Sequence, residues 1–348
     1  STKMTILFTG KTDFKYNRVR ILLKGLQNRE DVKVLLYPFK DRNECLLPEF
    51  KTLEQQADFI YIPPFRHRDV SFIRKLTNKP VVFDPLISKY LTKAVDYGHF
   101  WKGPFKYVLD KKPFSLADIL LADTQAHKDY FIRTFSIEES KIHVLPIGVD
   151  TSSFYASTDQ KPNDGLFRVG FYGSFVPLQG VSKILESAKL LEKEKDIHFE
   201  IIGSGYEYQK ILKQAERLQL DNTKFIGWVN YEELNQHLNN FDVCLGIFGN
   251  STKADVVIPN KIYHYASIGK CVITKNTPGI KEIFTHNQNA ILCSNAPFDI
   301  AEQILNAKKH PNHIQQIGKS ASSLINTEYN QDKIAEQFIA VLNNSRLS

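Results

Sequence analysis

Short apolar runs alternate with helical patterns through this chain, and the alternation starts afresh after a polar stretch at residues 151–165. This alternation is typical of parallel sheets covered by helices, because two parallel strands need a crossover connection between them. The apolar runs lie at 5–9, 32–37, 59–62, 81–83, 119–122, 143–145, 169–172, 199–202, 224–226 and 243–247. We therefore predict an α/β fold with two Rossmann-like, doubly wound parallel-sheet domains, residues 1–150 and 165–327, facing a central ligand cleft.

Length and composition agree with two domains of a cytoplasmic protein. A chain of 348 residues is too long for one ordinary core, and 42% hydrophobic with 24% charged residues is typical of globular proteins. No apolar run approaches the roughly 18–20 residues that cross a bilayer, and no secretory signal is visible. The four cysteines are far apart, which favours buried thiols over a zinc site or a disulfide framework: Cys45, Cys244, Cys271 and Cys293.

The positive charge is confined to the first half of the chain. Residues 1–150 hold 25 Lys and Arg against 18 Asp and Glu, whereas residues 151–348 hold 20 of each, so the whole excess of +7 lies in the first domain. Such asymmetry indicates an anionic partner. Nothing resembles a helix-turn-helix, a zinc finger or an RRM signature, so we expect an anionic membrane surface rather than nucleic acid.

The most informative segment for function runs from residue 248 to residue 274. It follows an apolar run and places two cations, Lys253 and Lys261, on either side of Ile258-Pro259-Asn260, where a small-residue helix begins. A loop with many N–H donors beside two cations suits a diphosphate group. The alternative is a surface loop with two solvated lysines.

Six further motifs occur in a fixed order along the chain. They are ADILLADT (117–124), KIHVLPIGVD (141–150), FYGSFVPLQG (171–180), IIGSG (201–205), FIGWV (225–229) and TPGIKEI (277–283). Together with Pro259-Asn260-Lys261, they resemble the retaining glycosyltransferases of family four, which have the GT-B fold. The resemblance covers nearly the whole chain. It implies a terminal helix at about residues 328–348 that completes the first domain.

The resemblance also points to donor-binding residues in the second domain. A glycine between a strand and a helix, Gly173, lets the backbone approach a phosphate or a sugar; the alternative is an ordinary tight turn. Many family members carry two basic residues near this loop, where this chain has Ser174 and Gln179. The diphosphate charge must then be met by Lys253 and Lys261. The same motifs assign Phe175, Gly203, Trp228, Val229 and Glu282 to the donor site.

A second departure concerns two glutamates that the family places eight residues apart. This chain has Val256 and His264 at those positions. In the family the second glutamate binds the nucleotide ribose, and a histidine can still hydrogen-bond a hydroxyl. We assign His264, with Pro259 and Asn260, to the donor site; a packed helix histidine is the alternative. For Trp228, stacking on the nucleotide base and a position in the core are the two alternatives.

Loops after the strands of the first domain carry the expected acceptor residues. Gly10 and Lys11 follow the first strand, in a G-K-T that lacks the earlier glycine of a Walker motif. His67 follows the third strand and Asp84 the fourth, and we interpret both as catalytic groups beside the acceptor. Their alternatives are a solvated loop histidine and a helix cap before Ser88, which we also assign to the acceptor. Leu86 lies nearest the position where many family members have a histidine.

A segment of the first domain, residues 89–112, interleaves aromatic residues with lysines. This mixture suits the headgroup region of a membrane, and a loop packed by its own aromatic residues is the alternative. We therefore expect a cytoplasmic protein that associates peripherally with the inner face of a membrane.

The resemblance implies a hexosyltransferase. It would move a sugar from a nucleotide-diphosphate donor to a hydroxyl of a glycan or lipid-linked acceptor, with retention, in lipopolysaccharide, polysaccharide or glycolipid synthesis. It implies no cofactor and no bound metal, because lysines and backbone N–H groups stabilise the departing diphosphate. Two alternatives remain: a catalytically weak partner subunit and a nucleotide-sugar 2-epimerase.

Overall fold

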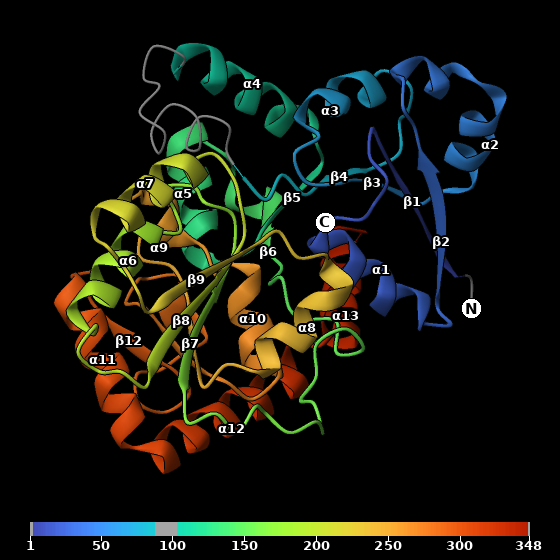
Figure 1. The fold of residues 1–348 in the computed structure, drawn as a ribbon. Coiled ribbons are helices and arrows are strands. Elements are labelled where there is room, and N and C mark those ends of the chain that lie inside the picture. The colour runs from blue at the N-terminus through green and yellow to red at the C-terminus, as the bar shows by residue number, and fades with distance from the viewer. Residues whose placement is uncertain (1–2, 88–102, 347–348) are drawn as a thin grey trace. The chain divides into compact units, whose positions relative to one another are not determined.

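The structure, a computed structural model, describes residues 3–87 and 103–346 (Figure 1). The chain divides into two compact units. The first consists of Ser1–Asp150 with Tyr329–Ser348, and the second of Thr151–Glu328. Each unit contains a six-stranded sheet in which every pairing is parallel.

The first unit is a doubly wound sheet with the strand order β2-β1-β3-β4-β5-β6. Its strands are β1 (Met4–Gly10), β2 (Val32–Pro38), β3 (Phe59–Ile62), β4 (Val81–Phe83), β5 (Ile119–Ala122) and β6 (Ile142–Val144). Its helices are α1 (Asn17–Gln27), η1 (Arg42–Leu46), α2 (Pro48–Gln56), α3 (His67–Arg74), α4 (Gly103–Leu116), α5 (Gln125–Phe135), η4 (Glu139–Lys141) and α13 (Gln331–Arg346). Strands β1, β3, β4 and β5 are buried along their whole length, as their continuous apolar runs require.

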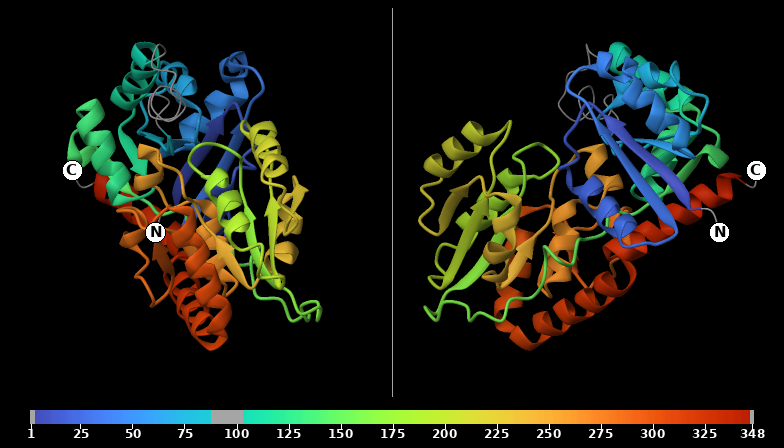
Figure 2. Two further views of the ribbon diagram at one scale, coloured as in Figure 1. Left: turned by 60° about the vertical axis from the view of Figure 1, so that its left-hand side comes forward. Right: turned by 90° about the vertical axis from the view of Figure 1, so that its right-hand side faces the viewer.

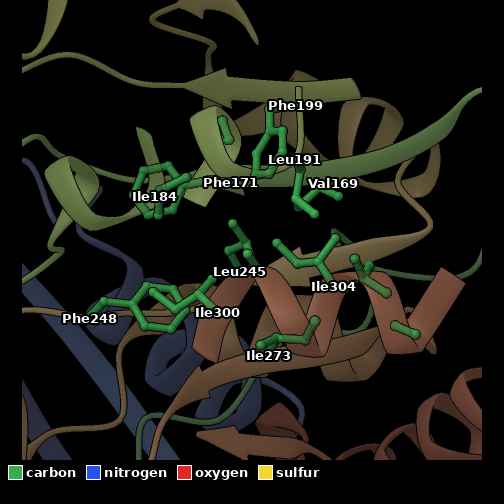
Figure 3. Packing of buried hydrophobic residues seen from close by; sticks show 14 of the residues in the cluster. Val169, Phe171, Ile184, Leu191, Phe199, Leu245, Phe248, Ile273, Ile300 and Ile304 are labelled. Carbon is green, nitrogen blue, oxygen red and sulfur yellow. The ribbon is translucent and has the colours of Figure 1, made fainter. Parts of the chain in front are cut away.

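The second unit has the strand order β12-β11-β10-β7-β8-β9. Its strands are β7 (Phe167–Tyr172), β8 (Ile197–Ile202), β9 (Thr223–Gly227), β10 (Val243–Leu245), β11 (Cys271–Lys275) and β12 (Ile291–Cys293). Its helices are α6 (Val181–Leu190), α7 (Tyr208–Arg217), α8 (Tyr231–Asn239), α9 (Thr252–Val256), α10 (Asn260–Ser267), η5 (Ile280–Glu282), α11 (Pro297–Lys309) and α12 (Pro311–Glu328). Figure 3 shows part of its core, where Phe171 and Leu245 of the sheet lie near Ile184 of α6 and Ile300 of α11.

The last helix, α13, belongs to the first unit although it follows the second in sequence. It packs against α1, as the views in Figures 1 and 2 show. The contact is close at Gly25, where an added Cβ would lie 2.0 Å from the carbonyl oxygen of Gln331 and 2.8 Å from the Cβ of Ala335. The absence of a side chain at Gly25 therefore allows the two helices to meet.

We expect Gly25→Ala to destabilise the protein by about 1–3 kcal/mol, because the new methyl group would overlap α13 backbone. A loss of stability would be informative, because alanine in a helix interior is ordinarily more favourable than glycine by about 1 kcal/mol. Lys24→Ala changes an exposed neighbour on the same helix and is the matched control. Urea unfolding measures both variants, and a Gly25→Ala protein as stable as the control would contradict the close contact.

The structure also bears on the expected membrane contact and on the expected state of the cysteines. Among residues 3–87 and 103–346, no helix is both long enough and apolar enough to span a bilayer. The four cysteines are buried free thiols, and burial raises the pKa of Cys45 and Cys271 to about 12. Most of the aromatic and lysine-rich segment, residues 88–102, lies outside the described residues, so its expected membrane contact stays a prediction.

Candidate active site

The second sheet has a topological switch point beside β7. The chain leaves β7 toward β8 on one side, and β10 pairs with the other side. In open parallel sheets, ligands bind outside the carboxyl ends of the strands at such a point. The loops there are residues 173–180 after β7 and residues 246–251 after β10. Backbone hydrogen bonds from Phe248 N to Gln179 O (3.0 Å) and from Gly249 N to Leu178 O (3.1 Å) join them.

Lys261 lies at the start of α10 and reaches the loop that follows β7. Its Nζ donates a hydrogen bond to Oε1 of Gln179 and lies 4.0 Å from the centre of the Phe171 ring. An added Cβ on Gly173 would lie 2.9 Å from this Nζ, so the glycine leaves the space that the ammonium needs. The structure thus brings together three residues assigned to the donor site.

The ammonium of Lys261 is buried, with 2% of the residue exposed. In the part of the chain that the structure describes, no carboxylate pairs with it. Burial therefore lowers the pKa of Lys261 well below its ordinary value. A buried cation without a counter-ion is costly, and an anionic ligand would supply the missing charge.

His264 lies one turn further along α10 and is also buried. Its ring stacks on Phe154, with ring centres 3.6 Å apart, and its Nδ1 is hydrogen-bonded to the hydroxyl of Tyr172. Its Nε2 has no hydrogen-bond partner among the described residues. Burial lowers the pKa of His264 to about 3, so the ring is neutral at physiological pH. A ribose hydroxyl would reach Nε2 only if the residues that cover the ring moved.

The other residues assigned to the donor site differ in exposure. Trp228, which follows β9, has 74% of its surface exposed and does not occupy the alternative core position. Phe175 is buried and stacks on Tyr208, so it supports the loop rather than presenting a ring to a ligand. Gly203 is buried; Val229, Lys253, Pro259 and Asn260 are half-buried; Ser174 and Glu282 are exposed. At one of the two glutamate positions, Val256 is buried on α9.

In the first unit, Asp84 lies at the carboxyl end of β4 and is fully buried. Its oxygens accept hydrogen bonds from Arg18 Nε (2.8 Å), Arg18 Nη2 (3.3 Å) and the hydroxyl of Tyr61 (2.5 Å). Arg18 also donates to the carbonyl oxygens of Leu145 and Pro146, both at 2.7 Å. This network ties α1, β3, β4 and the chain after β6 together, so Asp84 has a structural role in the first unit. Its expected place beside the acceptor stays a prediction.

His67 begins α3 and is buried, so it is not a solvated loop histidine. Its Nε2 lies 3.2 Å from the carbonyl oxygen of Ile87 and 3.4 Å from Oδ1 of Asp110. Its ring meets Phe83 edge-on, with centres 4.9 Å apart. His67 therefore connects α3 to α4 and to the chain that leads into residue 88. Ser88 itself lies outside the described residues.

Three non-glycine residues at the carboxyl edge of the first sheet have left-handed backbone conformations. Phe14 (φ 61°), Phe65 (φ 68°) and Leu86 (φ 62°) lie in the loops after β1, β3 and β4. Such conformations cost about 1–3 kcal/mol each and are concentrated at functional sites. Leu86 is the residue nearest the family's histidine. These loops form the carboxyl edge of the sheet, which is where Gly10 and Lys11 also lie.

A group of polar residues at this edge is not among the site residues predicted from sequence. Asp69, inside α3, accepts hydrogen bonds from Arg42, Arg66 and the backbone N–H of Lys11. In the sequence, His67 marked the loop after the third strand as a candidate acceptor loop. Nothing in the sequence near Arg42 connects it to that loop, because the two arginines are brought together only by the pairing of the strands. Within residues 3–87 and 103–346, no group of His, Cys, Asp and Glu side chains is arranged to hold a metal ion.

Solved structures define the class to which this fold belongs. Sucrose-phosphate synthase from Thermosynechococcus elongatus matches with a TM-score of 0.77 at 14% identity, over 98% of this chain and 99% of that one. HepE from Anabaena, solved with UDP and glucose, matches with a TM-score of 0.74 at 16% identity, over 98% and 99% of the two chains. The fold is therefore GT-B, and the predicted fold class is confirmed.

Sequence comparisons relate this chain to enzymes that transfer sugars. Residues 156–324 match the family model described as "Glycosyl transferases group 1". An MMP alpha-(1->4)-mannosyltransferase from Mycolicibacterium hassiacum is 29% identical over 86 residues, which is 24% of this chain and only 20% of that protein. With the GT-B fold, these similarities support a group 1 glycosyltransferase.

Proposed function

We propose that this chain is a retaining, metal-independent hexosyltransferase that uses a nucleotide-diphosphate sugar. The observation that carries the proposal is the buried ammonium of Lys261, which has no carboxylate partner among residues 3–87 and 103–346 and lies in the segment that matches the family model. The diphosphate of the donor would supply the missing negative charge.

The departing nucleoside diphosphate gains negative charge as the bond to the sugar breaks. Lys261 would stabilise that charge directly, and Gln179 would hold its ammonium in place. We assign Lys253 and the backbone around Gly173 and Ser174 to the remaining phosphate contacts. In this mechanism the lysines take the place of a divalent cation.

The nucleoside would lie further along the same edge of the sheet. The exposed indole of Trp228, at the carboxyl end of β9, is a suitable surface for a base, and we assign Val229 beside it to the same contact. Glu282, Pro259 and Asn260 complete the proposed donor contacts. UDP is the first nucleotide to test, since solved structures of HepE contain UDP and UDP-glucose.

The acceptor would bind at the carboxyl edge of the first sheet, near Gly10 and Lys11. A glycan or lipid-linked acceptor of lipopolysaccharide, polysaccharide or glycolipid synthesis fits the positive charge of residues 1–150. We propose a cytoplasmic location with peripheral binding to the inner face of a membrane. Among the structural neighbours, TarM was solved with fondaparinux, alpha-GlcNAc-glycerol and UDP, which gives a precedent for glycan acceptors on this fold.

A catalytically weak partner subunit is the second candidate. Two observations favour it: Val256 is buried where the family has a glutamate, and Phe154 covers His264 at the position of the other. A nucleotide-sugar 2-epimerase is not favoured by any arrangement of acidic residues described above.

The test is an assay of hydrolysis and transfer with a panel of UDP-, GDP- and dTDP-sugars, together with calorimetric titration of UDP, GDP and dTDP. Release of the nucleoside diphosphate with one donor supports the enzyme. Tight nucleotide binding without turnover supports the partner subunit. No binding of any nucleotide would reject both.

We expect the activity to survive treatment with EDTA, because the lysines replace a divalent ion as the counter-charge to the diphosphate. Initial rates measured before and after chelation, with magnesium and manganese added back, check this. A rate abolished by EDTA and restored by either metal would contradict the proposed role of the lysines.

A further inference from the structure

The first sheet also has a topological switch point, which lies at β1. Strand β1 pairs with β2 on one side and with β3 on the other. The loops after these three neighbouring strands therefore lie side by side at the carboxyl edge. They contain Lys11 after β1, Arg42 after β2 and Arg66 after β3. This is the position where open parallel sheets bind ligands.

Asp69 organises these three loops. Its Oδ2 accepts hydrogen bonds from the backbone N–H of Lys11 and from Nε of Arg66, both at 2.9 Å, and its Oδ1 accepts one from Nε of Arg42 at 2.8 Å. The carboxylate has no exposed surface. Asp69 therefore accepts one N–H group from each of the three loops, and it fixes the orientation of both arginines.

Both arginines keep most of their donors unused. Each guanidinium contacts Asp69 through Nε, and neither makes another hydrogen bond or ion pair among the described residues. The side chain of Arg42 is 32% exposed and that of Arg66 is 25% exposed. The carboxylate of Glu44, in the same η1 helix as Arg42, accepts hydrogen bonds from the backbone N–H groups of Lys40 and Asp41, and it forms no ion pair with either arginine.

Two guanidinium groups held on one carboxylate leave a net positive charge, with planar N–H donors at the surface. Arginine is the side chain best suited to bind phosphate or carboxylate, because its N–H groups match the spacing of the oxygen atoms. A neutral sugar hydroxyl would not need two cations. We propose that Arg42 and Arg66 form a binding site for an oxyanion carried by the acceptor, such as a phosphate or a carboxylate. This inference rests on the proposed glycosyltransferase function.

The oxyanion has two possible sources. One is a charged group on a soluble glycan. The other is the phosphate of a lipid, which would also explain the exposed leucines at the end of η1, Leu46 (63%) and Leu47 (49%). The chemistry at the arginines is the same for both sources, so the experiment distinguishes them with separate probes.

The test compares the wild type with three variants. Arg42→Gln/Arg66→Gln removes both cations. Arg42→Gln/Arg66→Gln/Asp69→Asn also removes the buried carboxylate, so it keeps the site testable if the double variant fails to fold. Arg29→Gln/Lys33→Gln is the matched control, since it removes the same charge near the amino end of β2.

Glycerol 3-phosphate, titrated by calorimetry with UDP at saturation, is the soluble probe. Vesicles of 30% phosphatidylglycerol in phosphatidylcholine, tested by co-sedimentation against pure phosphatidylcholine, are the membrane probe. We expect the arginine variants to weaken binding at least about tenfold, as the loss of charge-assisted hydrogen bonds does, and the control to change it little. A loss with both probes indicates a lipid phosphate, and a loss with glycerol 3-phosphate alone indicates a soluble acceptor.

Two outcomes would overturn the proposal: a wild type that binds neither probe, or equal losses in the arginine variants and the control. Titration of UDP alone tests the proposed function independently of the oxyanion site. A wild type that binds UDP but neither probe rejects the oxyanion site and leaves the proposed function intact. A wild type that binds the probes but no nucleotide rejects the proposed function.

Discussion

Turnover of the Lys261→Ala variant should fall about 100-fold or more, as the loss of a group that stabilises a leaving anion does. Lys261→Met keeps the aliphatic stem beside Phe171, so it separates the loss of charge from the loss of packing. Lys319→Ala, an exposed lysine on α12, is the control. Steady-state rates with the best donor of the panel measure the effect. Near-wild-type turnover in both Lys261→Ala and Lys253→Ala would reject the assigned diphosphate site.

The same lysine predicts a link between nucleotide binding and protons. Burial lowers the pKa of Lys261 well below its ordinary value, and a diphosphate beside it would raise that pKa again. UDP binding should therefore take up a proton when the pH lies between the two values, and affinity should fall as the pH rises from the pKa of the free protein to that of the complex. Calorimetry in buffers of different ionisation enthalpy measures this uptake. Uptake that persists unchanged in Lys261→Met would assign the proton to another group.

The second large effect is expected on stability. Asp84→Ala should lower the free energy of unfolding by about 3–5 kcal/mol, because it leaves the buried guanidinium of Arg18 without its carboxylate. Burial by itself would lower the pKa of Arg18, but the charge and hydrogen bonds of Asp84 oppose this effect, and the pKa lies above its ordinary value overall. Urea unfolding followed by circular dichroism measures the loss.

Arg18→Met/Asp84→Leu is the matched variant for this pair. It removes both charges together, so it should recover much of the stability that Asp84→Ala loses. The experiment also separates a stabilising Asp84 from a catalytic one. A variant that unfolds like the wild type but has lost its turnover would support the catalytic role that the sequence predicts for Asp84.

The parallel sheets could be predicted from sequence because each buried strand has its own local signal, a short apolar run between turns. The proximity of Gly173, Gln179 and Lys261 was predictable for a similar reason, since these residues stand in motifs with fixed spacing. The pattern predicts none of the elements between residues 276 and 327, where two helices, α11 and α12, follow one another directly without a strand between them.

Contacts between distant residues could not be predicted in this way. Nothing near Asp84 in the sequence indicates that Arg18, 66 residues earlier, takes both of its oxygens. Phe154 stacks on His264 from the polar stretch at residues 151–165, so a packed histidine was one of two alternatives but its partner was not foreseeable. For Trp228, both roles were open until the structure showed an exposed indole.

The position of α13 has a consequence for the order in which the protein folds during synthesis. Chains emerge from the ribosome with the N-terminal end first, and domains generally fold in that order. Here the surface of α1 around Gly25 is covered by a helix that is made only after the whole second unit. The first unit to be translated is thus the last to be completed. Until then it exposes an apolar helix face, the kind of surface that chaperones bind, and a fragment that ends at residue 150 would keep that face uncovered.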